Sequence, residues 1–204
     1  MDLPLKHKMK TTIVFFTLLF GKITFAQSSI NEDYIQNFYT IYKTEKFFAF
    51  QQVNTGIELL NSLQYSRSIN KFNKALEIDS NYCDALFLLG FCYQRKGQLD
   101  KSLDFCEKAL KINSNNPSAL IIKGTTLLMK NDTVNALESF QKAKNILPNK
   151  IDSYYGIAMV YYIEKKYDDA YSLIKEIEKI KNDDVIRRDK KKVEKLKLNI
   201  IAKK

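Results

Sequence analysis

The sequence contains no tryptophan, one histidine and only six glycines and three prolines among 204 residues. The histidine, His7, lies near the N-terminus, so the rest of the chain has no residue for Ser-His-Asp or Cys-His catalysis. A histidine-ligated metal site is excluded there for the same reason. Because tight turns depend on glycine and proline, their scarcity favours long helices over a fold rich in strands and turns.

No group of residues typical of catalysis, of a cofactor site or of a metal site is found. The glycines are spaced singly, so no phosphate-binding loop is present. The acidic pairs Asp168–Asp169 and Asp183–Asp184 fall at predicted turns and helix starts, where capping explains them. Cys83, Cys92 and Cys106 are an odd number, and the last two should point in different directions, so buried free thiols are expected. We therefore expect no enzyme activity, no cofactor and no metal.

The formal net charge of +10 is concentrated at the two ends of the chain. Residues 1–26 contain four lysines and one aspartate, and residues 185–204 contain nine basic and two acidic side chains. Residues 27–184 contain 20 basic and 20 acidic side chains and are neutral overall. The basic charge therefore lies at the two ends, and because export of the chain is expected from its first 26 residues, no nucleic-acid partner is expected.

Residues 1–26 have the layout of a cleaved secretory signal peptide. Basic residues precede a short apolar run at 11–21, and Ala26 stands before the expected cleavage site. The run is too short to cross a bilayer. The M-K-x-x-I start and the F-A-Q ending resemble export signals of the Bacteroidetes, so Met9 is an alternative start to Met1. We expect an exported protein, either periplasmic or secreted and associated with the cell envelope.

A period of 34 residues runs without a gap from residue 49 to residue 184. Each row contains two apolar stripes at helical spacing, separated by a short polar turn, which predicts a helix–turn–helix unit. Small residues mark the points where two packed helices cross, and Gly90 is expected to face Ser102. The columns are Gly56, Gly90, Gly124 and Ala158; Ser68, Ser102, Ala136 and Ala170; Phe72, Cys106, Phe140 and Ile174; and Ala75, Ala109, Ala143 and Ile177.

The pattern resembles the tetratricopeptide repeat (TPR), a 34-residue helix–turn–helix unit. Leu89 to Tyr93 (L-G-F-C-Y), Ala109 and Pro148 carry the resemblance, whereas the tryptophan common in the family's first helix is absent. The resemblance implies an all-α fold, a TPR-type α-solenoid of about four helix–turn–helix repeats. The expected repeats are residues 49–82, 83–116, 117–150 and 151–184.

The segments that flank the repeats are predicted to be helical. Residues 27–48 are aromatic-rich and are expected to form an N-terminal helix that covers the first repeat. The alternative is a segment that binds a partner. Residues 185–204 are expected to form a basic C-terminal capping helix with one apolar stripe. The alternative function for this helix is to hold the protein to an anionic membrane or envelope surface. The expected stripe is Ile186, Val193, Leu196 and Ile200.

The resemblance also implies that the first helix of each repeat lines a concave groove. In this sequence the stripe opposite the core-facing residues is apolar and aromatic and contains few charges, which favours a protein or peptide ligand. Family members that clamp a carboxylate use lysine and asparagine on this stripe, where apolar residues stand here, so that role is not supported. The alternative is that an end helix fills part of the groove. The expected lining is Val53, Ile57, Phe87, Phe91, Gln94, Arg95, Ile121, Thr125, Tyr155, Met159 and Tyr162. The sequence thus predicts a non-catalytic adaptor or scaffold that acts after export and whose partner is unknown.

Overall fold

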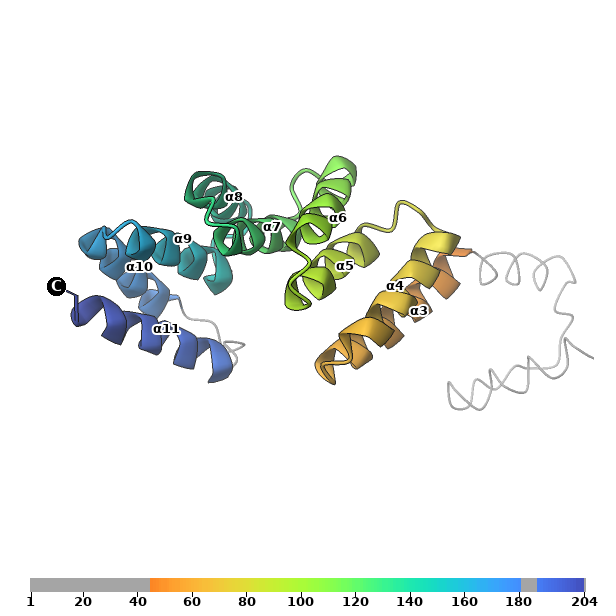
Figure 1. Cartoon of the computed structure of the whole chain (residues 1–204), viewed down its shortest axis with the longest axis horizontal. Helices are drawn as coiled ribbons and strands as arrows, with labels where there is room; N and C mark the ends of the chain where they lie inside the picture. Colours follow the sequence, from red (N-terminus) through yellow and green to blue (C-terminus); the bar gives the residue numbers. More distant parts are fainter. Residues whose placement is uncertain (1–44, 181–186, 204) are drawn as a thin grey trace, which may run out of the picture. The chain divides into compact units, whose positions relative to one another are not determined.

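The computed structural model describes residues 45–180 and 187–203, and these are folded almost entirely into helices (Figure 1). The predicted signal peptide and most of the predicted N-terminal helix lie outside the described residues, as does Ile186. Within the two described ranges there are nine helices and no strand. They are α3 (Glu45–Asn61), α4 (Tyr65–Ile78), α5 (Cys83–Arg95), α6 (Leu99–Ile112), α7 (Pro117–Met129), α8 (Thr133–Ile146), α9 (Ile151–Ile163), α10 (Tyr167–Lys179) and α11 (Arg187–Ile201).

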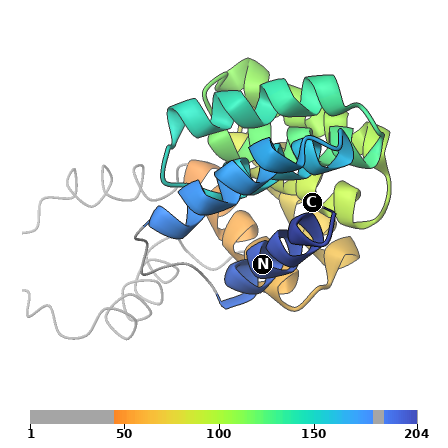
Figure 2. The same ribbon diagram turned by 90° about the vertical axis from the view of Figure 1, so that its left-hand side faces the viewer.

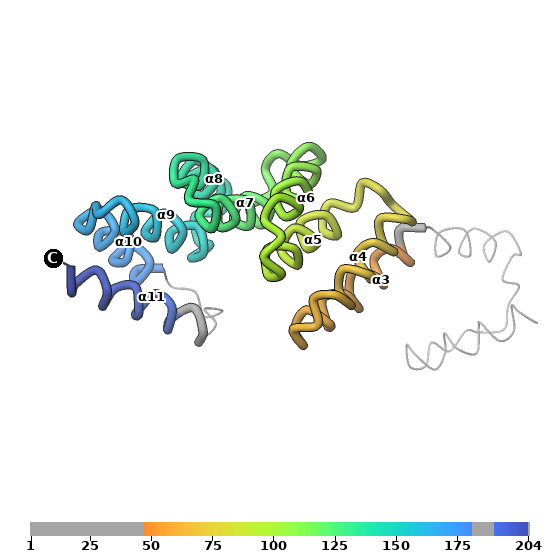
Figure 3. Tube along the Cα trace, viewed as in Figure 1, coloured from red at the N-terminus to blue at the C-terminus, as the bar shows by residue number. Residues whose placement is uncertain are grey.

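Consecutive helices pack as four helical hairpins, α3 with α4, α5 with α6, α7 with α8, and α9 with α10 (Figure 3). Each hairpin also contacts the next one, through α4 and α5, α6 and α7, and α8 and α9. The starts of α5, α7 and α9 follow one another at the period found in the sequence, and so do those of α4, α6, α8 and α10. The all-helical repeat fold predicted from the sequence is therefore confirmed. Helix α3 runs through residue 49 without a break, so the expected boundary between an N-terminal helix and the first repeat is not a helix end.

Each hairpin turn contains one residue in the left-handed backbone region, and these residues recur with the same period as the helix starts. The residue that follows it donates its backbone N–H to a carbonyl five positions back, as in Gln98 N to Tyr93 O at 2.9 Å. This hydrogen bond closes the end of the first helix and fixes where the second begins. The left-handed residues are Leu63, Gly97, Asn131 and Lys165, with φ values of 58°, 73°, 62° and 61°.

The core follows the columns found in the sequence. All four residues of the Phe72 column are fully buried, and so are all four of the Ser68 column. A Cβ placed on Gly90 would lie 2.8 Å from Cys106 Sγ and 3.2 Å from the Ser102 carbonyl oxygen, which confirms the predicted close crossing of α5 and α6.

Phe140 shows a second use of glycine that the sequence columns did not predict. A Cβ on Gly124 would lie 2.8 Å from Cε1 of this ring, and a Cβ on Gly156 would lie 2.5 Å from Cδ1. The ring on α8 thus packs against α7 of its own hairpin and α9 of the next. Ala158, which completes the glycine column, is fully buried, and Gly156 makes a separate close approach to Phe140 of the preceding hairpin.

The C-terminal helix α11 packs against α10 and α9, as Figure 2 also shows. Val193, Leu196 and Ile200 are buried in this contact, which confirms the described part of the predicted apolar stripe. Lys197 forms an ion pair with Glu178 of α10 at 2.7 Å. No helix among the described residues is long and apolar enough to span a membrane.

Candidate functional site

The eleven predicted binding residues all lie on the first helices of the hairpins, α3, α5, α7 and α9. Nine of them are at least partly exposed, but Val53 and Gln94 are only 3% and 8% exposed. Val53 belongs to the core cluster that contains Phe72 and Cys92. Because a side chain covered by the fold cannot contact a ligand in a groove, the prediction is wrong for Val53 and Gln94.

Gln94 connects two hairpins instead of lining a groove. Its Nε2 lies 2.6 Å from Thr125 Oγ1, 2.8 Å from Thr126 Oγ1 and 3.2 Å from the carbonyl oxygen of Ile122. The Thr126 hydroxyl in turn lies 2.9 Å from the hydroxyl of Ser102 on α6. A buried polar network therefore joins α5, α6 and α7, and it ties the second hairpin to the third.

Arg95 is exposed but is held against the first hairpin. Its Nε donates a hydrogen bond to the hydroxyl of Tyr65 at 3.3 Å, and its guanidinium carbon lies 5.9 Å from the centroid of the same ring. The neighbouring Lys96 donates to Ser66 at 2.9 Å. The only basic residue in the predicted set is thus already engaged with α4.

The α9 part of the predicted stripe is contacted by α11. The Lys192 ammonium lies 5.5 Å from the centroid of the Tyr155 ring and 3.7 Å from the Asp152 carboxylate. Burial raises the pKa of Tyr155, and the positive charge of Lys192 opposes that rise. Met159 and Tyr162 pack against the core cluster to which the buried residues of α11 belong. The sequence leaves open that an end helix fills part of the groove. On α9 this is the arrangement seen, because α11 contacts that part of the stripe.

What remains accessible is an apolar stripe on α3, α5 and α7. Phe50 and Ile57 are exposed on α3, at 49% and 37%, and Phe87 and Phe91 on α5 are partly buried. Ile121 and Thr125 continue the stripe on α7, where both are partly buried. We call these six residues the apolar stripe. It offers aromatic and aliphatic contact surface with few charges.

Two pockets lie away from the apolar stripe. One, of about 420 Å³, lies between the α9–α10 turn and the end of α11. The other, of about 610 Å³, lies over α7 between α6 and α8, and its lining includes Lys111, Lys123 and Lys142. None of the eleven predicted residues lines either pocket.

Two of the three thiols are buried, and Cys83 is partly buried. Cys83, Cys92 and Cys106 are all free, and the last two are buried in the core. Burial raises the pKa of Cys92 and of Cys106 to about 12, so neither is a thiolate near neutral pH. Among the described residues no cluster of three His, Cys, Asp or Glu side chains could hold a metal ion. The chemistry available on the apolar stripe is contact and hydrogen bonding.

Comparison with protein families gives a match to the tetratricopeptide repeat over residues 83–116. That segment contains α5 and α6, the second of the four hairpins. The match thus shows one tetratricopeptide repeat within the chain, at residues 83–116. The comparison with curated protein sequences found no match.

Several solved structures share the fold. PilF of Pseudomonas aeruginosa superposes with a TM-score of 0.69 at 19% identity, over 79% of this chain and 71% of that one. YrrB, described as a TPR protein with an unusual peptide-binding site, gives 0.57 at 21% identity, over 82% and 92%. The first TPR of Spaghetti (RPAP3), bound to the HSP90 peptide SRMEEVD, gives 0.56 at 13% identity, over 59% and 95%. These likenesses show that the chain has a TPR-like α-solenoid fold.

Proposed function

We propose that this protein is a non-catalytic adaptor or scaffold that binds a protein or peptide through the apolar stripe on α3, α5 and α7. The observation that carries the proposal is the exposure of Phe50 and Ile57 on α3 together with the partial exposure of Phe91 on α5, because solvent-facing apolar surface of this kind marks interaction sites. TPR proteins bind peptides in the Spaghetti complex and, according to its description, in YrrB. The shared fold supports the same class of partner here.

The chemistry of the stripe favours a ligand with apolar side chains. Arg95, the only basic residue in the predicted set, is hydrogen-bonded to Tyr65, so it is poorly placed to receive a carboxylate. Phe91 and Ile121 present aromatic and aliphatic surface instead. We therefore propose an apolar segment, extended or helical, as the ligand. An acidic tail such as SRMEEVD should bind poorly.

The proposed place of action is outside the cytoplasm, periplasmic or in the secreted and envelope fraction. This part of the proposal rests on the basic, apolar and Ala26-ending layout of residues 1–26. Cleavage after Ala26 would leave a chain that begins at Gln27. Mass spectrometry of the N-terminus of the natural protein tests this proposal, because an intact Met1 or Met9 would contradict it.

The binding proposal is tested with Phe50→Ala combined with Phe91→Ala. The matched control is Ile112→Ala with Leu147→Ala, two exposed apolar residues at and just beyond the ends of second helices. A partner is first captured from the envelope fraction with the wild-type chain, then purified and titrated against each variant by calorimetry. We expect the stripe variant to lose binding while the control binds like the wild type.

Thermal unfolding of each variant must be recorded alongside the titration. If the stripe variant binds normally, the apolar stripe is not the site. If instead it unfolds at a much lower temperature than the control, Phe50 and Phe91 are core residues and the assignment is also contradicted.

A second candidate function is association with an anionic surface through the basic C-terminal helix. The observation that favours it is the presence of exposed Leu198 and Ile201 on a helix whose exposed positions are otherwise mainly lysine. Such association should weaken strongly as salt is raised, because screening shortens the reach of surface charges. Association that is absent, or that does not respond to salt, contradicts this candidate.

A further inference from the structure

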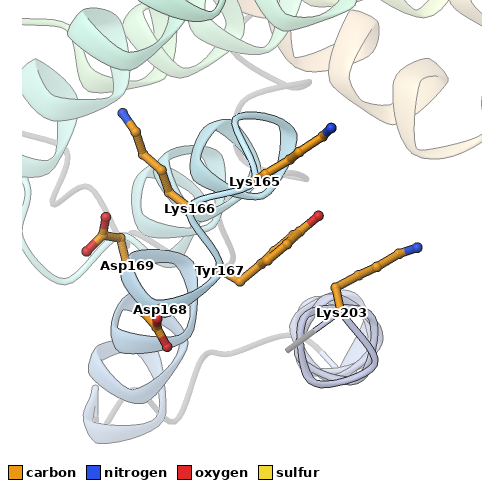
Figure 4. Close-up of a pocket in the computed structure, with 6 residues that line it drawn as sticks. All are labelled: Lys165, Lys166, Tyr167, Asp168, Asp169 and Lys203. Carbon is orange, nitrogen blue, oxygen red and sulfur yellow. The ribbon is translucent and has the colours of Figure 1, made fainter.

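The pocket at the end of α9, α10 and α11 differs from the apolar stripe in its chemistry. It is lined by residues of the α9–α10 turn, by the first turn of α10 and by the end of α11 (Figure 4). In this view the side chains of Lys165, Tyr167 and Lys203 extend toward the same side. The carboxylates of Asp168 and Asp169 lie on the other side. Three hydrogen-bond donors from two separate elements thus gather apart from the acidic groups.

The local charge of this pocket is positive on the side of the donors. Lys166 forms an ion pair with Glu164 at 2.8 Å, and that hydrogen bond raises the pKa of Lys166. Lys165 and Lys203 have no ion pair within the part of the chain that the structure describes. Their ammonium groups and the Tyr167 hydroxyl are suited to bind the oxygens of an anion.

Exposed aliphatic residues lie at the same end of these helices. Ile163 is the last residue of α9 and is 49% exposed, whereas Leu198 and Ile201, near the end of α11, are 58% and 48% exposed. The packing of α11 does not need them, since Val193 and Ile200 on its inner side are already buried. The C-terminal segment 185–204, to which α11 belongs, carries nine basic and two acidic side chains.

We propose that this terminal patch binds the surface of an anionic phospholipid bilayer. The patch consists of Ile163, Lys165, Tyr167, Leu198, Ile201 and Lys203. In this arrangement a headgroup phosphate occupies the pocket between the two lysines and the tyrosine hydroxyl. The aliphatic side chains enter the boundary between headgroups and acyl chains, where lysine and tyrosine are also well accommodated.

Lipid is favoured over other anionic partners by the combination of charge and exposed apolar surface. A soluble polyanion would be bound by the lysines alone and would gain nothing from Ile163, Leu198 and Ile201. A bilayer interface uses both, because apolar burial and attraction to anionic headgroups add to each other. The inference rests on the second candidate function above and assigns it to particular residues.

The test is co-sedimentation of the chain beginning at Gln27 with lipid vesicles. Vesicles of phosphatidylcholine alone are compared with vesicles that also contain phosphatidylglycerol. We expect binding only to the second kind. Lys165→Gln with Lys203→Gln should weaken it about thirty-fold, from the usual contribution of a lysine near an anionic surface. The control, Lys111→Gln with Lys142→Gln, removes the same charge from α6 and α8 and should weaken binding far less.

A second pair of variants tests the apolar part of the patch. Leu198→Ser with Ile201→Ser should weaken binding about tenfold, because two partly inserted aliphatic side chains are lost. Met129→Ser with Val134→Ser, which alters exposed apolar residues beside the α7–α8 turn, should not. Circular dichroism must show that every variant is folded.

The outcomes separate the inference from the function on which it rests. If the wild-type chain ignores phosphatidylglycerol, the second candidate function and the inference both fail. If it binds but each variant pair weakens binding as much as its control pair, surface association stands and the terminal patch is not its site. Loss confined to the Lys165 and Leu198 variants supports the patch.

Discussion

The sequence places Gln94 in a binding groove, whereas the structure places it in a buried hydrogen-bond network. Replacing Gln94 tests which of these two roles is correct. The change Gln94→Ala removes an amide with two N–H groups, which are surrounded by three acceptors at 2.6, 2.8 and 3.2 Å. Each net hydrogen bond contributes about 1 kcal/mol, so the variant should lose about 2 kcal/mol in free energy of unfolding. Thr126 keeps the Ile122 carbonyl as a partner at 2.7 Å, which limits the loss.

The assays are urea unfolding and thermal unfolding, each followed by far-ultraviolet circular dichroism, combined with hydrogen exchange. For a chain of this size a loss of about 2 kcal/mol corresponds to a fall in Tm of about 4–8 °C. Hydrogen exchange should quicken most in α5 and α7, because the network joins these two helices. The double variant with Thr126→Val should show a coupling energy of about 1 kcal/mol or more, as expected for residues that share a hydrogen bond.

Measuring partner binding by the same variants shows whether Gln94 acts in the groove instead. A variant at Gln94 that keeps full stability but loses the captured partner would refute the structural role and restore the residue to the groove. Phe91→Ala is the useful comparison, since that residue lies one helical turn away on the same helix and remains partly exposed. We expect stability to fall mainly in the Gln94 variant and binding to fall mainly in the Phe91 variant.

Two further predictions concern the core. Gly156→Ala places a Cβ 2.5 Å from Cδ1 and 2.6 Å from Cζ of Phe140. The cost of overpacking should exceed the gain in helix propensity, so the free energy of unfolding measured with urea should fall by about 1–2 kcal/mol. A stabilised variant would contradict this packing. Cys92 and Cys106 should resist a thiol reagent at pH 8 until the chain is unfolded, since their pKa is about 12 in the fold. The ordinary pKa of these thiols is 9.0, so as the pH rises the unfolded chain releases their protons before the folded chain does. Their contribution to stability is therefore full below pH 9.0 and falls as the pH rises above it. Rapid labelling of the native chain would contradict the burial of the two thiols.

The fold could be predicted because its packing repeats with the sequence. A crossing of two helices in one hairpin requires small residues at one fixed position and apolar side chains that fill the core at another. The Ser68 column and the Phe72 column are therefore visible in the sequence alone, and both are buried in the fold. The turns repeat for the same reason, with left-handed residues such as Gly97 and Asn131 one period apart. Local geometry of this kind is encoded within a single repeat.

The binding residues could be predicted only in part, because each first helix contacts more than one neighbour. A stripe defined as the side opposite the second helix of the same hairpin also includes positions that face the next hairpin or the one before. Gln94 is such a position, because its amide is buried against α7 of the next hairpin. Val53 is also buried, in the cluster that contains Phe72 and Cys92. Gly156 was missed for a related reason, since its partner Phe140 belongs to the preceding hairpin.

Helix α11 shows why charge and packing must be judged separately. It begins two residues after the point, residue 185, where a fifth repeat would start if the period continued from Ile151. Its inner residues behave as those of a first helix and cover the last hairpin, and this role alone requires a polar outer side. Leu198 and Ile201 are not polar, and their exposure opposes the solubility that a capping helix provides. Other exposed apolar residues, such as Met129 and Val134, lie elsewhere on the repeats. What distinguishes Leu198 and Ile201 is that they lie on a helix rich in lysine, and a bilayer interface uses this combination of charge and apolar surface.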